Sequence, residues 1–126
     1  MKYKNIMIIE NGQGDGALIK DAAELLHPEI NCRIESDPSR AFRYLQANSI
    51  PDLLFLDYTA TLPDGCKLKN VISATESLKT LYVITYYIYA REGTGGLPSE
   101  KDVDFYLAKP INLGWLADIM GYLIKI

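Results

Sequence analysis

Pro51-Asp52-Leu53-Leu54-Phe55-Leu56-Asp57 is a short apolar stretch that ends in a carboxylate. A continuous apolar run of this length, unlike an alternating one, is typical of a strand buried on both faces of a sheet. In open α/β sheets, ligands bind outside the carboxyl ends of such strands. Asp57 is therefore the first candidate for a functional residue in this chain.

Four further apolar runs of strand length accompany this one, and segments with helical periodicity separate them. The runs cover residues 6–9, 30–34, 81–84 and 103–107, and the stretch quoted above supplies a run at 53–56. Apolar residues three or four positions apart predict helices around residues 18–26, 41–45, 68–72 and 113–124. Asp37-Pro38 and Asn112 are start signals for the second and the last of these helices.

Alternating strands and helices indicate a parallel sheet with right-handed crossovers and helices on both faces. The 126 residues suffice for one domain, residues 1–126. We expect a flavodoxin-like, doubly wound α/β fold with a five-stranded parallel sheet in the order 2-1-3-4-5. The fourth helix is expected to be weak or missing, because residues 91–98 contain three glycines and a proline. In a helix interior each glycine costs about 1 kcal/mol and a proline about 3 kcal/mol relative to alanine.

Composition and charge exclude several classes of function. The net charge is −3 and no segment concentrates Lys and Arg, so we expect no direct nucleic-acid partner. No apolar run reaches the roughly 18 residues of a membrane span, so we expect no membrane partner either. Cys32 and Cys66 are far apart in the sequence and form no C-x-x-C pattern, so we expect free thiols in a reducing cytoplasm. The chain has a single histidine, His27, which argues against a histidine-based metal site or a catalytic triad.

Three other predicted strands are followed by residues that could act together with Asp57. These are Glu10-Asn11, Thr85 and Lys109-Pro110. On the expected fold, Glu10, Asn11 and Asp57 share the crevice outside the carboxyl ends of the first and third strands. Taken singly, an aspartate at a strand end is more often a loop or cap residue, and a Lys-Pro pair is usually a turn. Their joint occurrence favours a functional site.

In this order the residues resemble the receiver domain of bacterial-type two-component response regulators, over essentially the whole chain. In that family strand 1 ends in an acidic pair, strand 3 in aspartate, strand 4 in Ser or Thr, and Lys-Pro follows strand 5. The matching segments are Ile8-Ile9-Glu10-Asn11, Leu56-Asp57, Ile84-Thr85 and Leu107-Ala108-Lys109-Pro110. The spacing from Asp57 to Gly65 also fits, and Tyr106 stands at the position of the family's switch aromatic.

The resemblance implies that Asp57 accepts a phosphoryl group from a sensor histidine kinase or a phosphotransfer protein. Such a domain is a signalling phosphoacceptor and not an enzyme in the ordinary sense; at most it catalyses its own phosphorylation and dephosphorylation. Lys109 would pair with the phosphoryl group, and Thr85 would donate a hydrogen bond to it. Movement of Thr85 would make room for Tyr106 to turn inward and alter a partner-binding surface.

The resemblance also implies bound Mg²⁺, a hard cation that takes oxygen ligands. Its protein ligands would be Asp57, the Asn11 side chain and the Thr59 backbone carbonyl, with Glu10 reaching it through water. Asn11 departs from the family, which normally has an aspartate there, so the lost charge should weaken the metal site. Direct ligation by Glu10 is an open alternative. Tyr86 departs as well, since the family has a small residue there, and we expect it to shield Asp57 from phosphodonors and water.

Two other functions are compatible with some of these residues. One is a pseudo-receiver, an interaction module that is independent of phosphorylation, which Asn11, Tyr86 and the degraded fourth helix favour. The other is a dinucleotide-binding domain, for which Gly12-x-Gly14-x-x-Ala17 and Glu35 are close to the expected pattern. Against the latter, Glu10 and Asp15 would crowd a pyrophosphate with negative charge, and Asp57, Thr85 and Lys109 would have no role.

The output partner is open at this point. The chain could be a stand-alone receiver or part of a regulator with a fused output domain. Receivers often form homodimers through the region of the fourth helix, which is the segment this chain has altered. Tyr82, Tyr86, Tyr87 and Tyr89 crowd the same region, either as strand residues or as an aromatic partner-binding patch.

Overall fold

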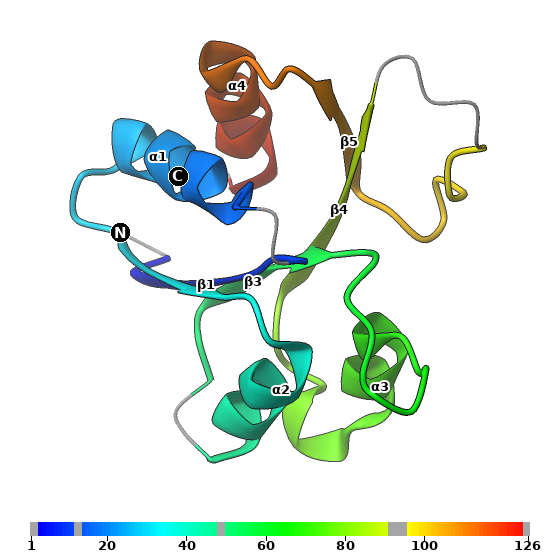
Figure 1. Cartoon of the computed structure of the whole chain (residues 1–126). Coiled ribbons are helices and arrows are strands. Elements are labelled where there is room, and N and C mark those ends of the chain that lie inside the picture. Colours follow the sequence, from blue (N-terminus) through cyan, green and yellow to red (C-terminus); the bar gives the residue numbers. More distant parts are fainter. Residues whose placement is uncertain (1–2, 12–13, 48–49, 91–95, 125–126) are drawn as a thin grey trace.

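The computed structural model describes residues 3–11, 14–47, 50–90 and 96–124. Strands and helices alternate along the chain, apart from the segment between the last two strands (Figure 1). The strands are β1 (Asn5–Ile9), β2 (Asn31–Glu35), β3 (Leu53–Asp57), β4 (Val83–Ala90) and β5 (Phe105–Lys109). The helices are α1 (Gly16–Leu26), α2 (Pro38–Ala47), α3 (Leu68–Ala74) and α4 (Leu113–Ile124), with a 3₁₀ turn at Glu76–Leu78.

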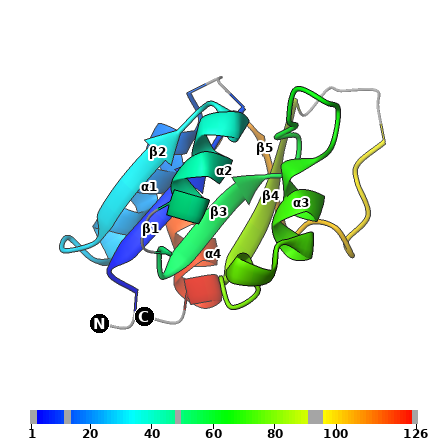
Figure 2. The same ribbon diagram turned by 90° about the horizontal axis from the view of Figure 1, so that it is seen from below.

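The five strands form one parallel sheet in the order β2-β1-β3-β4-β5. Helices α1 and α4 cover one face of this sheet, and α2 and α3 cover the other (Figures 1 and 2). The order of strands and the two-sided helical cover confirm the predicted flavodoxin-like architecture. Because all strands are parallel, their carboxyl ends lie at one edge, where Asp57 closes β3.

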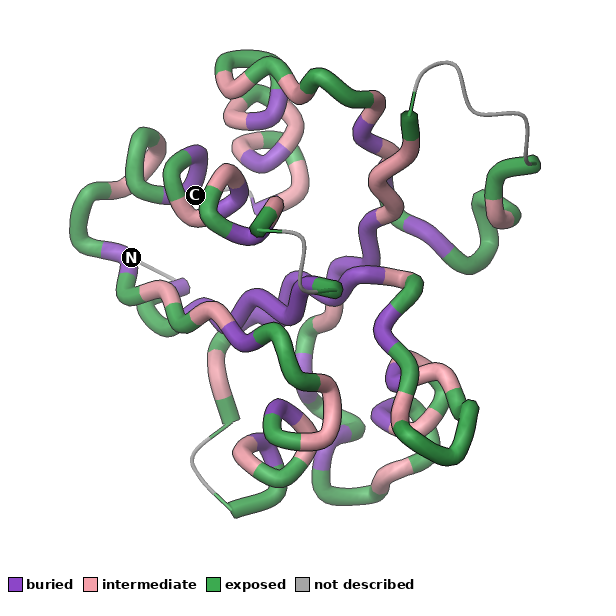
Figure 3. Tube along the Cα trace, in the orientation of Figure 1, coloured by how far each residue is buried: buried purple, intermediate pink, exposed green. Residues whose placement is uncertain are grey.

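Each face of the sheet has its own hydrophobic core, and the central strands contribute to both. Within β3, Leu53 and Phe55 pack with the residues of α1 and α4, whereas Leu54 and Leu56 pack with those of α2 and α3. The whole of β3 is buried, as the continuous apolar run predicted (Figure 3). Burying each such side chain contributes roughly 1.5–3 kcal/mol.

Both predicted helix starts are present. Asp37 Oδ1 accepts a hydrogen bond from the backbone N–H of Ser39, 3.0 Å away, immediately before the body of α2. Asn112 Oδ1 accepts one from the N–H of Trp115, 2.9 Å away, at the start of α4. Each bond satisfies a donor that the first helical turn leaves without an intrahelical partner.

Strand β4 is longer than predicted and begins later. The apolar run suggested residues 81–84, whereas the strand extends from Val83 to Ala90. Its second half pairs with β5 in a register that joins Tyr86 to Phe105 and Ala90 to Lys109. Tyrosine has a high strand propensity, and pairing with β5 extends β4 beyond the end of the apolar run. Thr85 therefore lies inside β4 rather than at its end.

The described residues between β4 and β5, 96–104, form no helix. A single turn closes at 99–102, where the N–H of Asp102 donates to the carbonyl of Ser99, 2.9 Å away. The prediction of a weak or missing fourth helix is confirmed for these residues, while residues 91–95 of the glycine-rich segment lie outside the described part. The turn is tied to α3 by an ion pair of 3.8 Å between Lys69 and Asp102.

Candidate functional site

Asp57, the last residue of β3, is a buried carboxylate with only 3% of its surface exposed. Its Oδ1 accepts two hydrogen bonds from Thr59, one from the backbone N–H at 2.8 Å and one from the hydroxyl at 2.7 Å. Burial raises the pKa of the Asp57 carboxyl, and the charge of Asp15 adds to the rise, whereas the Thr59 bonds and Lys67 oppose it. The site thus keeps a carboxylate in a poorly solvated place.

Two of the predicted metal ligands meet at Thr59. The Asn11 amide Nδ2 donates to the Thr59 hydroxyl over 3.5 Å, and that hydroxyl in turn donates to Asp57. The Thr59 carbonyl, the third predicted ligand, accepts a bond of 2.8 Å from the Thr61 hydroxyl. Asn11, Asp57 and Thr59 are therefore brought together, and their carboxylate, amide and carbonyl oxygens fit the ligand preference of Mg²⁺. In the described ranges no three His, Cys, Asp or Glu side chains form a metal-binding group.

Glu10 follows β1 and is buried, and one of its carboxylate oxygens caps the N-terminus of α1. Glu10 Oε2 accepts a hydrogen bond from the backbone N–H of Gly16, 2.6 Å away, at the first residue of α1. A Cβ at position 16 would lie 2.6 Å from the same oxygen, so only glycine allows this approach. We predicted that Glu10 reaches a cation through water. Because its Oε2 caps α1, the contact with water would be made by Oε1.

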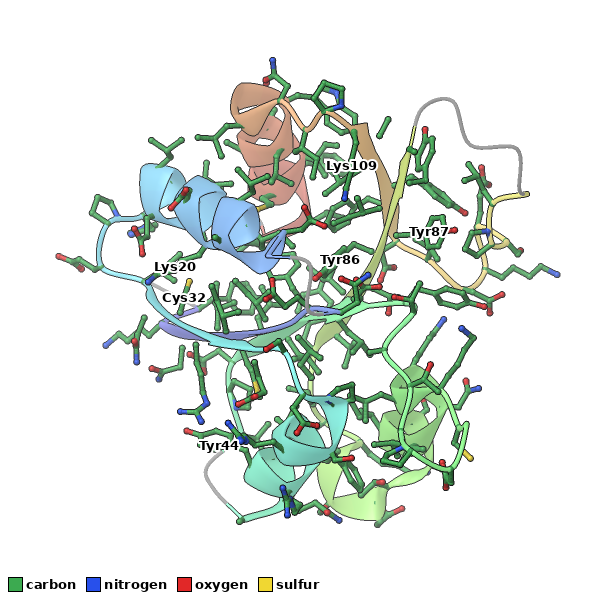
Figure 4. The ribbon with its side chains drawn as sticks, viewed as in Figure 1. Lys20, Cys32, Tyr44, Tyr86, Tyr87 and Lys109 are labelled. Atoms are coloured by element: carbon green, nitrogen blue, oxygen red, sulfur yellow. The ribbon has the colours of Figure 1, made fainter. Side chains whose placement is uncertain are left out.

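Lys109 is the last residue of β5, and its side chain lies on the side of the sheet that α1 and α4 cover (Figure 4). Its Nζ lies 3.7 Å from Oδ2 of Asp15, the residue that precedes α1. Asp15 was predicted only to crowd a pyrophosphate with negative charge and not to belong to this site. The available signal was a carboxylate directly before a predicted helix, five residues after Glu10 and four after Asn11.

Thr85 is buried and its backbone is held by Asp104 from the segment before β5. The N–H of Thr85 donates to Asp104 Oδ2 at 2.7 Å, and the N–H of Asp104 donates to the Thr85 carbonyl at 2.8 Å. In the register of β3 and β4, Thr85 lies opposite Leu56, one residue before Asp57. Asp104 is a second residue that was not predicted, because its contact with Thr85 depends on the pairing of β5 with β4.

Tyr86 does not stand where a shield over Asp57 would stand. It lies directly opposite Asp57 in the strand register, but its side chain is fully buried, and its ring stacks on Phe105 with centroids 5.9 Å apart. The hydroxyl donates to the backbone carbonyl of Ile9 over 3.0 Å. Burial and the negative charges of Asp57, Glu10 and Asp15 raise the pKa of the phenol. The large ring of Tyr86 turns toward the α1–α4 core (Figure 4) and does not cover Asp57 from the solvent side.

A series of tyrosine rings connects the loop after Asp57 with the predicted switch residue. Tyr58 meets Tyr87 edge-on with centroids 6.2 Å apart, and Tyr87 meets Tyr106 in the same manner at 6.5 Å. Tyr106 faces the described segment before β5, residues 96–104, called the turn segment below, where its hydroxyl donates to the carbonyl of Pro98 at 2.6 Å. Of these rings the sequence analysis assigned only Tyr106 to the site and did not foresee the connection through Tyr87, which needs two strands side by side.

Comparison with known proteins gives a structural answer only. No protein-family model matches the chain, and no curated protein matches it. Among solved structures, it is similar to the phosphorylated cyanobacterial phytochrome response regulator RcpA, with a TM-score of 0.67 and 23% identity over 98% of this chain and 96% of that one. The signal receiver domain of a DNA-binding response regulator from Colwellia psychrerythraea 34H gives 0.67 and 22%, over 98% and 99%.

A third similar structure is the CheY-like receiver domain from Methylobacillus flagellatus, with a TM-score of 0.59 and 20% identity over 96% of this chain and 98% of that one. These similarities show that the chain has the fold of response regulator receiver domains, as the resemblance in its sequence implied. No helix in the described ranges is long and apolar enough to cross a membrane.

Proposed function

We propose that this protein is a receiver domain of two-component signalling whose Asp57 accepts a phosphoryl group. The observation that supports this most strongly is the buried Asp57 carboxylate at the carboxyl edge of β3, beside Thr59 and Asn11. The donor class is a phosphohistidine on a sensor kinase or a phosphotransfer protein. Localisation in the cytoplasm agrees with the free thiols of Cys32 and Cys66.

In the proposed reaction a carboxylate oxygen of Asp57 attacks phosphorus and the bond from phosphorus to the donor nitrogen breaks. We assign the attack to Oδ2, because Oδ1 accepts both hydrogen bonds from Thr59. Those two bonds orient the carboxylate before the donor arrives, which lowers the entropic barrier of the transfer. Lys109 and the Thr85 hydroxyl supply positive charge and a hydrogen bond to the transferred oxygens.

Mg²⁺ would be held by Asp57, the Asn11 amide oxygen and the Thr59 carbonyl, with Glu10 contributing through water. When bound, the cation neutralises charge on the transferring phosphoryl group. The Asn11 amide contacts Thr59 through its nitrogen, and the Thr59 carbonyl accepts one bond from Thr61, so both contacts are compatible with a bound cation. The missing charge at position 11 supports weaker Mg²⁺ binding than an aspartate would give.

The switch step would connect this site with Tyr106. A shift of Thr85 toward the phosphoryl group would pull on Asp104, because the Thr85 backbone exchanges two hydrogen bonds with the backbone N–H and the side-chain carboxylate of Asp104. Tyr106 lies two residues after Asp104 and is held to Pro98 by its hydroxyl. A change at Asp57 would thereby alter the surface formed by β4, β5 and the turn segment, where an output partner or a second copy of the chain would bind.

The decisive experiment combines Mg²⁺ with beryllofluoride, a mimic of the phosphoryl group, or with acetyl phosphate. We expect intact-mass spectrometry after acetyl phosphate to show the addition of one phosphoryl group. NMR spectra with beryllofluoride should show shifts at Thr59, Thr85 and Tyr106. Asp57→Asn is the matched control and should show neither. If the wild type shows no adduct and no shifts at millimolar Mg²⁺, the protein is not a phosphoacceptor.

That negative outcome would favour the second candidate, a pseudo-receiver that binds its partner without phosphorylation. Two observations favour a pseudo-receiver. Asn11 stands in place of an acid, and Glu10 uses its Oε2 to cap α1. The dinucleotide-binding alternative is disfavoured, because a pyrophosphate would need the N–H groups at the start of α1. Glu10 already occupies the N–H of Gly16, and of the glycine pattern Gly12 lies outside the described residues.

A further inference from the structure

Asp15 occupies the position directly before α1, where an aspartate ordinarily caps the helix with its side chain. Here it makes no side-chain capping bond, and its backbone is already helical with φ −69° and ψ −19°. Glu10 takes over that task by accepting the N–H of Gly16. The Asp15 carboxylate is thereby turned to another partner.

That partner is Lys109, across the gap between α1 and the end of β5. The Lys109 ammonium lies 3.7 Å from Asp15 Oδ2, and the Asp15 side chain is only 15% exposed, against 43% for Lys109. The charge of Asp15 also acts on Asp57 and on the Tyr86 phenol, where it raises both pKa values. Asp15 is thus a partly buried anion within electrostatic reach of the phosphoacceptor.

We propose that Asp15 is a positioning residue that holds Lys109 in the unphosphorylated protein and gives it up when a phosphoryl group arrives on Asp57. This proposal rests on the proposed function. A phosphoryl group carries about −1.5 to −2 charges at neutral pH, so it competes well with a single carboxylate for one ammonium. The exchange opposes the binding of any anionic group at Asp57, because Lys109 must first leave Asp15. Asp15 would therefore set how readily the site is phosphorylated.

The test is a double-mutant cycle on beryllofluoride affinity, with Mg²⁺ raised until it saturates each variant. Asp15→Asn should tighten binding by about threefold to tenfold, because it releases Lys109 and removes a negative charge from the pocket. Asp21→Asn, an exposed residue of α1, makes the same change in net charge and should leave the affinity unchanged. In a Lys109→Gln background the gain from Asp15→Asn should fall to the smaller part that the lost negative charge alone contributes, because the rest depends on the pair of Asp15 with Lys109.

A second readout covers the case in which Lys109→Gln binds too weakly to measure. The NMR signals of the Lys109 side-chain methylene next to Nζ should shift in free Asp15→Asn, toward their position in the beryllofluoride-bound wild type. Unchanged or weaker beryllofluoride binding in Asp15→Asn, an equal gain with Lys109→Gln, or an unmoved Lys109 signal would overturn the proposal. A wild type that does not respond to beryllofluoride at all would instead contradict the phosphoacceptor function itself, and the exchange with it.

Discussion

The side chain of Glu10 accepts a hydrogen bond from the backbone N–H of Gly16, and the two atoms lie 2.6 Å apart. This contact joins the end of β1 to the start of α1 at the edge where Asp57 lies. It satisfies a helix donor and places negative charge at the positive end of the helix dipole. It also relieves Asp15 of capping, so the carboxylate next to α1 is available for Lys109.

Gly16→Ala should therefore destabilise the protein, although alanine is the better helix former. Its Cβ would lie 2.6 Å from Glu10 Oε2, so the carboxylate must move and the cap is lost. We expect a loss of about 1–2 kcal/mol in the free energy of unfolding, measured by urea denaturation. Gly121→Ala in α4 is the control: its Cβ would meet Leu26 at an ordinary 3.6 Å, and helix propensity should make it neutral or stabilising. Equal effects of both substitutions would contradict the cap.

Asp57→Asn should raise the melting temperature at neutral pH in the absence of Mg²⁺. Burial raises the pKa of Asp57 above its ordinary value of 3.8, so between the two values the folded protein binds more protons than the unfolded chain. The wild type therefore loses stability as the pH rises through the folded-state pKa, and Asp57→Asn does not. Thermal melts from acidic to neutral pH should show the difference vanishing below the ordinary value. A lower melting temperature of Asp57→Asn at neutral pH would contradict this.

Tyr86→Phe should lower stability by about 1 kcal/mol, because it removes a buried hydrogen bond to Ile9 and keeps the ring in place. Tyr82→Phe is the matched control, since Tyr82 is 42% exposed, and its effect should stay within about 0.5 kcal/mol. The rate of phosphorylation by acetyl phosphate should be nearly unchanged in Tyr86→Phe, because the phenol is fully buried and donates its hydrogen bond to Ile9. A large change in that rate with unchanged stability would restore the shielding role.

Tyr87→Leu should uncouple Tyr106 from Asp57. The Tyr87 ring contacts both Tyr58 and Tyr106, and leucine cannot make the two edge-on contacts. With beryllofluoride and Mg²⁺ we expect the NMR signals of Thr59 to shift as in the wild type. The shift of the Tyr106 ring signals should fall by half or more. This loss corresponds to a reduction on the order of 0.5 kcal/mol or more in the coupling free energy between Asp57 and Tyr106. Tyr89→Leu is the control, because among the described rings Tyr89 contacts Tyr87 alone. A full Tyr106 response in Tyr87→Leu would rule out this connection.

The two thiols should differ sharply in reactivity. Burial raises the pKa of Cys32 to about 11, so at pH 8 only about one molecule in a thousand carries its thiolate. Cys66 is exposed, although its hydrogen bond to Asp64 raises its pKa as well. Iodoacetamide should modify one cysteine in the folded protein, and mass mapping should find it at Cys66. Cys66→Ser should abolish the fast modification, whereas Cys32→Ser should leave it unchanged.

Local sequence predicted most of the fold because the strands of a parallel sheet are continuous apolar runs and its helices are amphipathic. The run ending at Asp57, the capping residues Asp37 and Asn112, and the glycine-rich segment after β4 all carry their signal within a few residues. The extension of β4 to Ala90 could not be read in this way. It depends on pairing with β5, which brings Tyr86 beside Phe105 across nearly twenty residues of chain.

Local sequence patterns and the resemblance predicted the strand order, the carboxylate at the end of β3, and Asn11 and Thr59 beside it. The uses of the polar side chains emerged only in the assembled fold: Glu10 caps α1, Tyr86 turns into the core, and Asp15 pairs with Lys109. Burial and periodicity can be predicted locally because they are properties of short segments. The direction of a polar side chain depends instead on which partner the assembled sheet brings within hydrogen-bond or ion-pair distance.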